Sequence, residues 1–128
     1  MAKKALTEYS ISQLKNKADK IFSLWIRARD KKCFTCGSTD NLQNGHYIPR
    51  NCLELRYDVR NNHAQCVGCN VFKKGNYTVY SLKMMQKYGD NILYELDEIV
   101  KKYKADGLRK YPKQFYIDVI TRYSPKEK

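Results

Sequence analysis

The sequence has no apolar run long enough to cross a membrane, which takes about 20 predominantly apolar residues in succession. Its first ten residues, MAKKALTEYS, contain no apolar stretch of the kind that a secretory signal needs, so we expect a cytoplasmic protein. Because the cytoplasm keeps thiols reduced, we expect no disulfides. The chain also lacks internal repeats and low-complexity linkers, and its 128 residues predict a single domain over 1–128.

Acidic residues are scarce relative to basic ones. The chain has 13 aspartates and glutamates against 25 lysines and arginines, which gives a net charge of +12. The excess is spread along the chain, and it favours a polyanionic partner, most simply nucleic acid. A merely soluble basic surface would have the same composition. The 11 tyrosines are equally ambiguous, because they can pack in a core or stack on bases.

Four of the five cysteines form two Cys-x-x-Cys pairs, Cys33 with Cys36 and Cys66 with Cys69. Two such pairs can close around one tetrahedral ion with sulfur–metal distances of about 2.3 Å, so the spacing predicts a structural zinc. Redox dithiols are disfavoured because neither pair lies in a βαβ pattern. Iron in a rubredoxin-like site remains an alternative. Four thiolates fill a closed site, so Cys52 is predicted to be a spectator.

A long amphipathic helix is predicted over 10–30. Ser10 and Gln13 have the spacing of a capping box. Apolar residues follow at spacings of three and four: Ile11, Leu14, Ala18, Ile21, Phe22, Trp25 and Ile26. We expect this helix to cover the zinc module, with Trp25 buried against it.

The segment 33–75 is predicted to form a zinc-bound core of two strands and a helix. Residues 42–48 and 53–59 have the composition and alternation of an antiparallel strand pair. A short helix over 62–73 would carry the second cysteine pair, with Gly75 as its C-cap.

Three further helices are predicted in the basic segment 76–123, over 76–88, 90–106 and 112–123. Glycines end the first two, and Pro112 opens the third, in a position that the first helical turn tolerates. The expected fold is therefore α+β: a zinc-stapled ββα core with an N-terminal helix and a C-terminal helical extension.

One histidine and two asparagines stand out within the cysteine frame. His46 lies on the first predicted strand, Asn61 lies five residues before Cys66, and Asn70 directly follows Cys69. A lone histidine is more often a packed or surface ring than a catalytic one. Both asparagines, however, would lie on the element that folds against His46 in a strand–strand–helix arrangement.

This constellation resembles the HNH, or ββα-metal, nucleases from Cys33 to about Tyr80. The Cys-Asn ending is similar to that of the endonuclease VII type of Holliday-junction resolvase. The resemblance is closer still to the phage lambda NinG (Rap) recombination nucleases. The segments that carry it are IRARDKKCFTCG, GHYIPR, NNHAQCVGCN and GNYTVY.

The resemblance implies a metal-dependent endonuclease that hydrolyses phosphodiester bonds in branched DNA, such as a Holliday junction or D-loop, during phage-type recombination. His46 would be the general base, and Asn61 would hold the loop backbone and orient it. Asn70 would bind one catalytic Mg²⁺ or Mn²⁺ through its carbonyl oxygen. The zinc would be structural, and the host cytoplasm would be the site of action.

The sequence departs from the resembling family at one position. Many members place an aspartate, a second metal ligand, directly before the histidine, where this chain has Gly45. The NinG-like branch shares this Gly-His pairing. Other residues that could complete the metal shell remain open: Asn44, Asp58, Asn62 and His63.

Several residues near these motifs are candidates for DNA contacts: Arg50, Arg56, His63, Lys73 and Lys74. Exposed charge beside the hairpin, or a helix-surface position for His63, would explain the same residues. A symmetrical cut across a four-way junction needs two active sites, so the resemblance also allows a homodimer, with the C-terminal helices as one possible interface.

Two other functions fit parts of the pattern. A non-catalytic zinc module that binds DNA or RNA explains the charge and the cysteines without using His46. It predicts salt-sensitive binding without cleavage at any Mg²⁺ or Mn²⁺ concentration. An iron redox protein would be visibly coloured.

Overall fold

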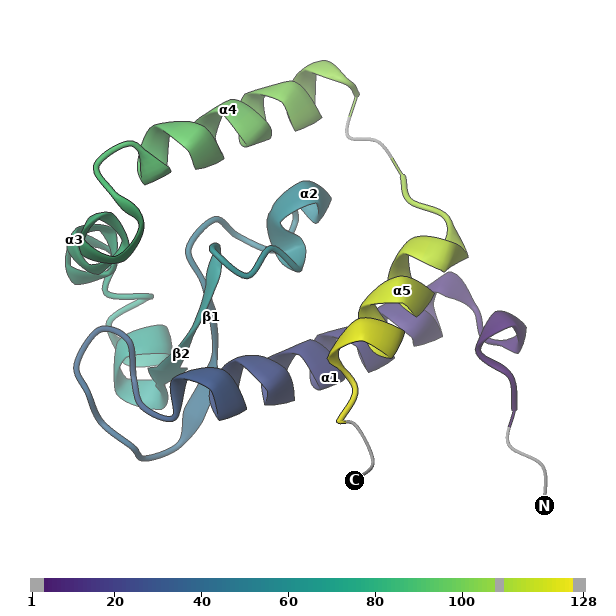
Figure 1. Ribbon diagram of the computed structural model, residues 1–128, viewed down its shortest axis with the longest axis horizontal. Coiled ribbons are helices and arrows are strands. Elements are labelled where there is room, and N and C mark those ends of the chain that lie inside the picture. The colour runs from purple at the N-terminus through teal and green to yellow at the C-terminus, as the bar shows by residue number, and fades with distance from the viewer. Residues whose placement is uncertain (1–3, 108–109, 126–128) are drawn as a thin grey trace. The chain divides into compact units, whose positions relative to one another are not determined.

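The computed structural model describes residues 4–107 and 110–125, and Figure 1 shows their helices and strands. The fold is α+β, as the sequence predicts. The chain divides into two compact units, one made of the residues up to Trp25 together with those from Lys110 onward, and the other of Ile26–Arg109. No helix in the described ranges combines the length and the apolar character that crossing a membrane requires.

The first unit pairs most of α1 (Ile11–Asp30) with α5 (Lys113–Tyr123), next to the short 3-10 helix η1 (Leu6–Glu8). The predicted capping box is present, because Ser10 and Gln13 exchange hydrogen bonds between side chain and backbone at 2.9 and 3.1 Å. Both predicted helices therefore form within a residue or two of their expected bounds.

The core of this unit is apolar and aromatic, and consists of Leu14, Ala18, Phe22, Tyr116, Val119 and Ile120. Trp25, which we expected to be buried against the zinc module, is only half-buried. Its ring packs edge-on against Tyr123, with 4.8 Å between the ring centroids, and also stacks with Phe22.

The second unit contains the only sheet among the described residues. It is an antiparallel pair of β1 (Leu42–His46) and β2 (Asn62–Cys66), in a register that places His46 opposite Asn62. The prediction of β1 is confirmed. The predicted second strand over 53–59 is wrong, because that segment begins with the one-turn helix α2 (Leu53–Arg56).

The strand partner comes from the segment that we predicted to be a helix over 62–73. Only the π-helical turn η2 (Gly68–Phe72) of that helix exists. All five residues of β2 are buried, although three of them are polar. A strand buried on both faces shows no apolar–polar alternation, which is why the pattern in the sequence did not reveal it.

The outer edge of β2 is paired with the end of α1 and the first cysteine pair. The N–H of Ala64 donates to Asp30 Oδ2 at 2.8 Å, and the N–H of Phe34 donates to the Ala64 carbonyl at 2.7 Å. Arg29 donates to the carbonyls of Val59 and Asn62 at 3.0 and 2.7 Å. Side chains thus satisfy backbone groups that an open sheet edge would leave unpaired.

Two helices follow η2, α3 (Tyr77–Tyr88) and α4 (Ile92–Ala105), close to the predicted bounds. α4 packs on both α2 and α3. Gly75 has a φ of +95°, a conformation that favours glycine, and its N–H donates to the Cys69 carbonyl at 2.8 Å. The turn between η2 and α3 is therefore tied back to the second cysteine pair.

Candidate functional site

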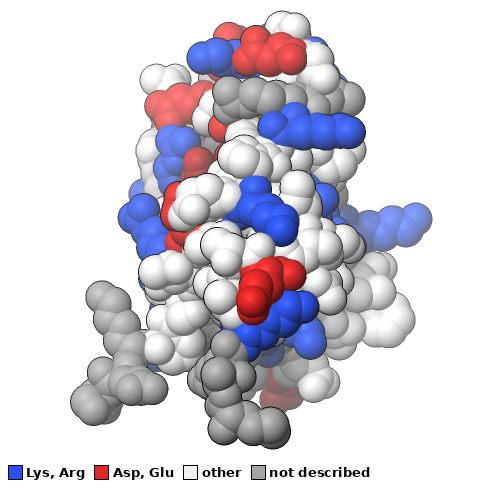
Figure 2. Space-filling model, turned by 90° about the vertical axis from the view of Figure 1, so that its right-hand side faces the viewer, with Lys and Arg blue, Asp and Glu red and all other residues white. Residues whose placement is uncertain are grey.

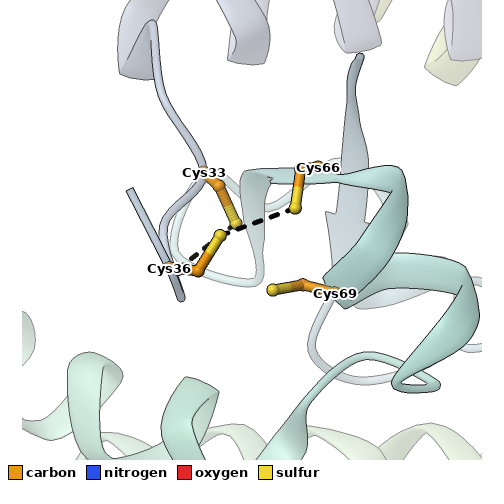
Figure 3. A group of neighbouring side chains, drawn as sticks. All are labelled: Cys33, Cys36, Cys66 and Cys69. Carbon is orange, nitrogen blue, oxygen red and sulfur yellow. Dashed lines mark hydrogen bonds between the residues drawn. The ribbon is translucent and has the colours of Figure 1, made fainter. Parts of the chain in front are cut away.

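The four paired cysteines converge on one point (Figure 3). Their sulfur atoms all lie within 4.8 Å of one another, and of the four residues only Cys36 is exposed. A tetrahedral ion with sulfur–metal distances of about 2.3 Å requires sulfur–sulfur separations of about 3.8 Å. The Cys36 and Cys66 sulfurs are 3.5 Å apart, so the group fits a metal with little adjustment.

The hydrogen bonds around the sulfurs favour a thiolate at Cys33. Burial raises the pKa of this thiol, but hydrogen bonds from the Thr35 hydroxyl and neighbouring backbone N–H groups outweigh burial and lower the pKa to about 6. At Cys36 the backbone of Ser38 lowers the pKa, yet hydrogen bonds shared with the other sulfurs and burial raise it to about 12. A cation would replace the protons that these sulfurs share.

Cys52 is not part of this group. It is buried at the start of α2, and it lines a cavity together with Ile48, Val100 and Tyr103. Burial raises the pKa of its thiol. Cys52 thus lies outside the four-cysteine group, as the sequence predicts.

Asn61 holds the backbone directly after His46. His46 is the last residue of β1 and is half-buried. The fully buried Asn61 side chain accepts a hydrogen bond from the Ile48 N–H at 2.7 Å and donates to the carbonyls of Ile48 and Leu55 at 3.0 and 3.2 Å. Its own carbonyl accepts from the Tyr47 N–H at 2.8 Å. This geometry suits the positioning role that the resemblance implies.

Asn70 lies on η2 and contacts a different part of β1. Its side-chain amide donates to Gln43 Oε1 at 2.8 Å. Because side chains alternate along a strand, Gln43 and Gly45 point to one face of the sheet and His46 to the other. Asn70 is therefore on the Gly45 face.

The space beside Gly45 is filled by Gln65. A Cβ atom at residue 45 would collide with Gln65 Oε1 and would lie within 2.8 Å of two carbon atoms of the same side chain. The Gln65 amide nitrogen donates to Thr35 Oγ1 and to the Gly75 carbonyl at 3.2 and 2.9 Å, but its buried oxygen has no hydrogen-bond partner among the described residues. An amide oxygen thus occupies the place where many of the HNH nucleases that the sequence resembles would have an aspartate side chain.

His63 is fully buried, which corrects its prediction as a surface residue and DNA contact. Tyr80 donates its hydroxyl proton to the Gly45 carbonyl at 2.6 Å, so its oxygen accepts from His63 Nδ1–H at 3.1 Å. His63 Nε2 is then unprotonated and accepts from the Tyr88 hydroxyl at 2.7 Å. This chain of hydrogen bonds links α3 to the residue directly before His46.

The imidazole of His63 is held in its neutral form. Burial and the positive charges of Arg29 and Lys87 together lower its pKa to about 3, against the opposing effect of Asp30. The ring also stacks on Phe34, with 4.0 Å between the centroids. His63 therefore acts as a structural hydrogen-bond relay in this fold.

Comparison with known proteins decides the family. A family model described as "Bacteriophage Lambda NinG protein" matches residues 2–126. The chain belongs to the NinG family.

Three phage proteins named "Protein ninG" illustrate the similarity. The protein of Salmonella phage P22 is 33% identical over 92 residues, which cover 68% of this chain and 45% of the relative. Those of Escherichia phage 933W and Escherichia phage lambda are 34% and 33% identical over 85 residues, covering 62% of this chain and 42% of each relative. The matched region thus spans less than half of the length of these NinG proteins. No solved structure matches the chain.

The basic residues predicted to contact DNA differ in their accessibility. Arg56 is buried and donates to the Arg50 carbonyl at 3.0 Å, so it shapes the loop after β1, which corrects its prediction as an exposed DNA contact. Arg50, Lys73 and Lys74 are exposed. On the face drawn in Figure 2, basic and acidic side chains are interspersed, so the excess positive charge forms no single patch there.

The sequence analysis did not identify three residues that contact Gly45 or His63 next to the site. Gln65 and Tyr80 lie within segments that carry the resemblance but had no role assigned, and Tyr88 lies outside those segments. Gln65 is positioned by Thr35 and Gly75, and the two tyrosines by contacts between α3 and the sheet. Asn44 Nδ2 donates to Asn62 Oδ1 at 3.1 Å, and the buried Asn44 Oδ1 has no hydrogen-bond partner among the described residues. Asn62 also donates to three carbonyls in and after α2. Asp58 pairs with Arg60, with 3.3 Å between oxygen and nitrogen.

Proposed function

We propose that this NinG-family chain is an HNH-type endonuclease that hydrolyses phosphodiester bonds in branched DNA during phage-type recombination. The observation that carries the proposal is the clamp of Asn61 on the backbone beside His46, inside a frame of four converging cysteines. The branched substrate rests on family resemblance, which is a weaker argument than the geometry of the site.

The cysteines would hold a structural zinc with no open position for water, because four thiolates complete a tetrahedral shell. Removing that ion would release both ends of the segment that carries His46 and Asn61. The zinc has a scaffolding role in this proposal.

His46 would accept the proton of a water molecule that attacks the phosphorus atom. One phosphorus–oxygen bond forms as the bond to the 3′ oxygen breaks. Asn61 fixes the path of the chain through Ile48, two residues beyond His46, and Tyr80 holds the Gly45 carbonyl on the other side. The imidazole would therefore be presented from a strand end that is tied on both sides.

A catalytic Mg²⁺ or Mn²⁺ would be held by the Asn70 side-chain oxygen, because hard cations prefer oxygen donors. The unpartnered Gln65 Oε1 is a second oxygen beside Gly45, on the same face of β1 as the Asn70 contact to Gln43. Such an ion, when bound, neutralises charge on the phosphate and stabilises the leaving oxygen. Water and the phosphate itself would supply the remaining ligands. Because His46 points to the other face of β1, the scissile phosphate would have to lie at the end of this strand to reach both the ion and the imidazole.

Cleavage of a four-way junction, a flapped duplex and a plain duplex, with and without Mn²⁺, tests the proposal. His46→Ala should lower the cleavage rate by at least about 100-fold, since positioned general bases contribute about 10²–10⁴-fold. Asn70→Ala should lose turnover while keeping DNA affinity. Asn16→Ala, at an exposed position on α1, is the matched control and should cut normally. Unchanged cutting by His46→Ala would overturn the mechanism.

A non-catalytic metal module that binds DNA or RNA is the second candidate. It is favoured by one observation, the absence of any carboxylate at residue 45 and the filling of that space by Gln65. It predicts binding that weakens with salt, no cleavage with either ion, and no effect of Asn70→Ala beyond a small change in affinity.

A further inference from the structure

Four consecutive exposed residues follow Asn70: Val71, Phe72, Lys73 and Lys74. We call them the knuckle tip. Phe72 is 79% exposed, the highest value among the large hydrophobic residues that the structure describes, and Val71 is 51% exposed. A phenylalanine that exposed contributes almost nothing to a core. Together with the adjacent Val71 it forms an exposed apolar pair next to two lysines, and contiguous exposed apolar surface marks interaction sites.

The knuckle tip is held firmly although its side chains are exposed. The N–H of Lys73 donates to the Gly68 carbonyl at 2.9 Å, and the N–H of Lys74 donates to the Val71 carbonyl at 3.1 Å. Cys69 of the metal group lies on one side and Gly75, bonded to both Cys69 and Gln65, on the other. A turn whose backbone is fixed in this way loses little backbone entropy when its side chains bind a partner.

The surrounding charge identifies the kind of partner. Between Asp58 and Asp90 the chain has no acidic residue but has five basic ones, two of them in the knuckle tip. A binding partner must therefore combine negative charge with a flat apolar surface. Nucleic acid has this combination, because its phosphates attract lysine and its bases stack on aromatic rings.

We infer that Phe72 stacks on a DNA base at an unpaired or branched position, while Lys73 and Lys74 contact the flanking phosphates. This inference rests on the proposed function only in taking DNA as the substrate. Exposing a base face costs least where stacking is already interrupted, so the knuckle tip would favour branch points over continuous duplex. Because Phe72 is two residues beyond Asn70, the stacked base would also determine which phosphate comes near Asn70.

Binding without added Mg²⁺ or Mn²⁺ tests the inference separately from cleavage. The metal-loaded chain is titrated into a four-way junction that carries 2-aminopurine at its branch point, and into a duplex of the same sequence. Phe72→Ala should weaken junction binding roughly 10-fold, change duplex binding much less, and remove the change in 2-aminopurine fluorescence, in keeping with the size of base–aromatic stacking. Phe72→Trp should restore all three properties.

Tyr94→Ala is the matched control, because Tyr94 is a 74% exposed aromatic residue on α4 beside the acidic Glu95. It should leave junction binding unchanged. Any of three results would overturn the inference. The two alanine variants could lose the same junction affinity, Phe72→Ala could lose the same affinity for junction and duplex, or the fluorescence change could persist in Phe72→Ala. A chain that binds in this way but never cuts would refute the nuclease proposal alone.

Discussion

At the scale of single residues, the site depends on buried polar side chains with specific partners. Asn61, Asn62, His63 and Gln65 are all fully buried, and each makes hydrogen bonds that fix a neighbouring segment. Burying polar groups without such partners would cost roughly 1–3 kcal/mol each. These four residues therefore define one arrangement of the loop and strand around His46.

His63 gives the fold a distinctive dependence on pH. Its pKa is about 3 in the folded chain against an ordinary value of 6.5, so the unfolded chain binds the extra proton between these values. The stability that the neutral ring contributes is complete above pH 6.5 and is lost as the pH falls. The expected slope from this residue is up to about 1.4 kcal/mol per pH unit.

Urea unfolding of the metal-loaded chain at pH 7 and pH 5.5 measures this effect. His63→Phe keeps an aromatic ring against Phe34 but has no titrating group, so its stability should depend less steeply on pH. The thiols of the metal group are common to both proteins and cancel in the comparison. Identical slopes would show that His63 does not titrate on unfolding.

At the scale of secondary-structure elements, β2 is stabilised by the end of α1 as well as by its strand partner. Asp30, the last residue of α1, accepts from the Ala64 N–H and from Arg29. Burial raises the pKa of Asp30, but these hydrogen bonds and the positive charge of Arg29 outweigh burial and lower it. The carboxylate therefore remains charged and caps the outer edge of the sheet.

Asp30→Ala should lower the free energy of unfolding by about 1–3 kcal/mol, because it leaves the Ala64 N–H without its acceptor. Chemical denaturation at pH 7 provides the measurement. Asp97→Ala removes an exposed ion pair with Lys101 on α4 and should leave the free energy of unfolding nearly unchanged, because water screens the pair. Equal effects of the two changes would contradict the role of Asp30.

The pattern of elements also shows where sequence reasoning fails. Helices α1, α3, α4 and α5 were predictable because each has an apolar stripe or a terminating residue that belongs to the helix itself. The segment 53–59 has the alternation of a strand, yet it begins with α2. Asn62–Cys66 has no such alternation, yet it is the strand.

At the scale of the whole molecule, the metal group is expected to govern stability. Structural zinc contributes on the order of 10–16 kcal/mol in small finger peptides, which exceeds or matches the roughly 5–15 kcal/mol net stability of a typical domain. The unit 26–109 contains all four ligands, and its only sheet in the described ranges has Cys66 at one end. Loss of the ion should therefore disorder this unit.

Cys66→Ala should lose bound zinc and the cooperative unfolding transition of this unit, as followed by metal analysis and circular dichroism. Cys52→Ala is the matched control, since Cys52 is also buried but lies outside the metal group. It should keep one zinc per chain. A Cys66→Ala protein with native helix content and unchanged melting would refute the structural role of the metal.

The sequence by itself determined the four-cysteine frame and helices α1, α3, α4 and α5, because these depend on local spacing and on a residue's own neighbours. Only the tertiary structure decided that Asn62–Cys66 is the partner strand, that His63 and Arg56 are buried, and that Gln65 fills the space beside Gly45. Such features arise from contacts between distant segments. A buried polar side chain is stabilised by whichever group the fold brings to it, and no local pattern contains that information.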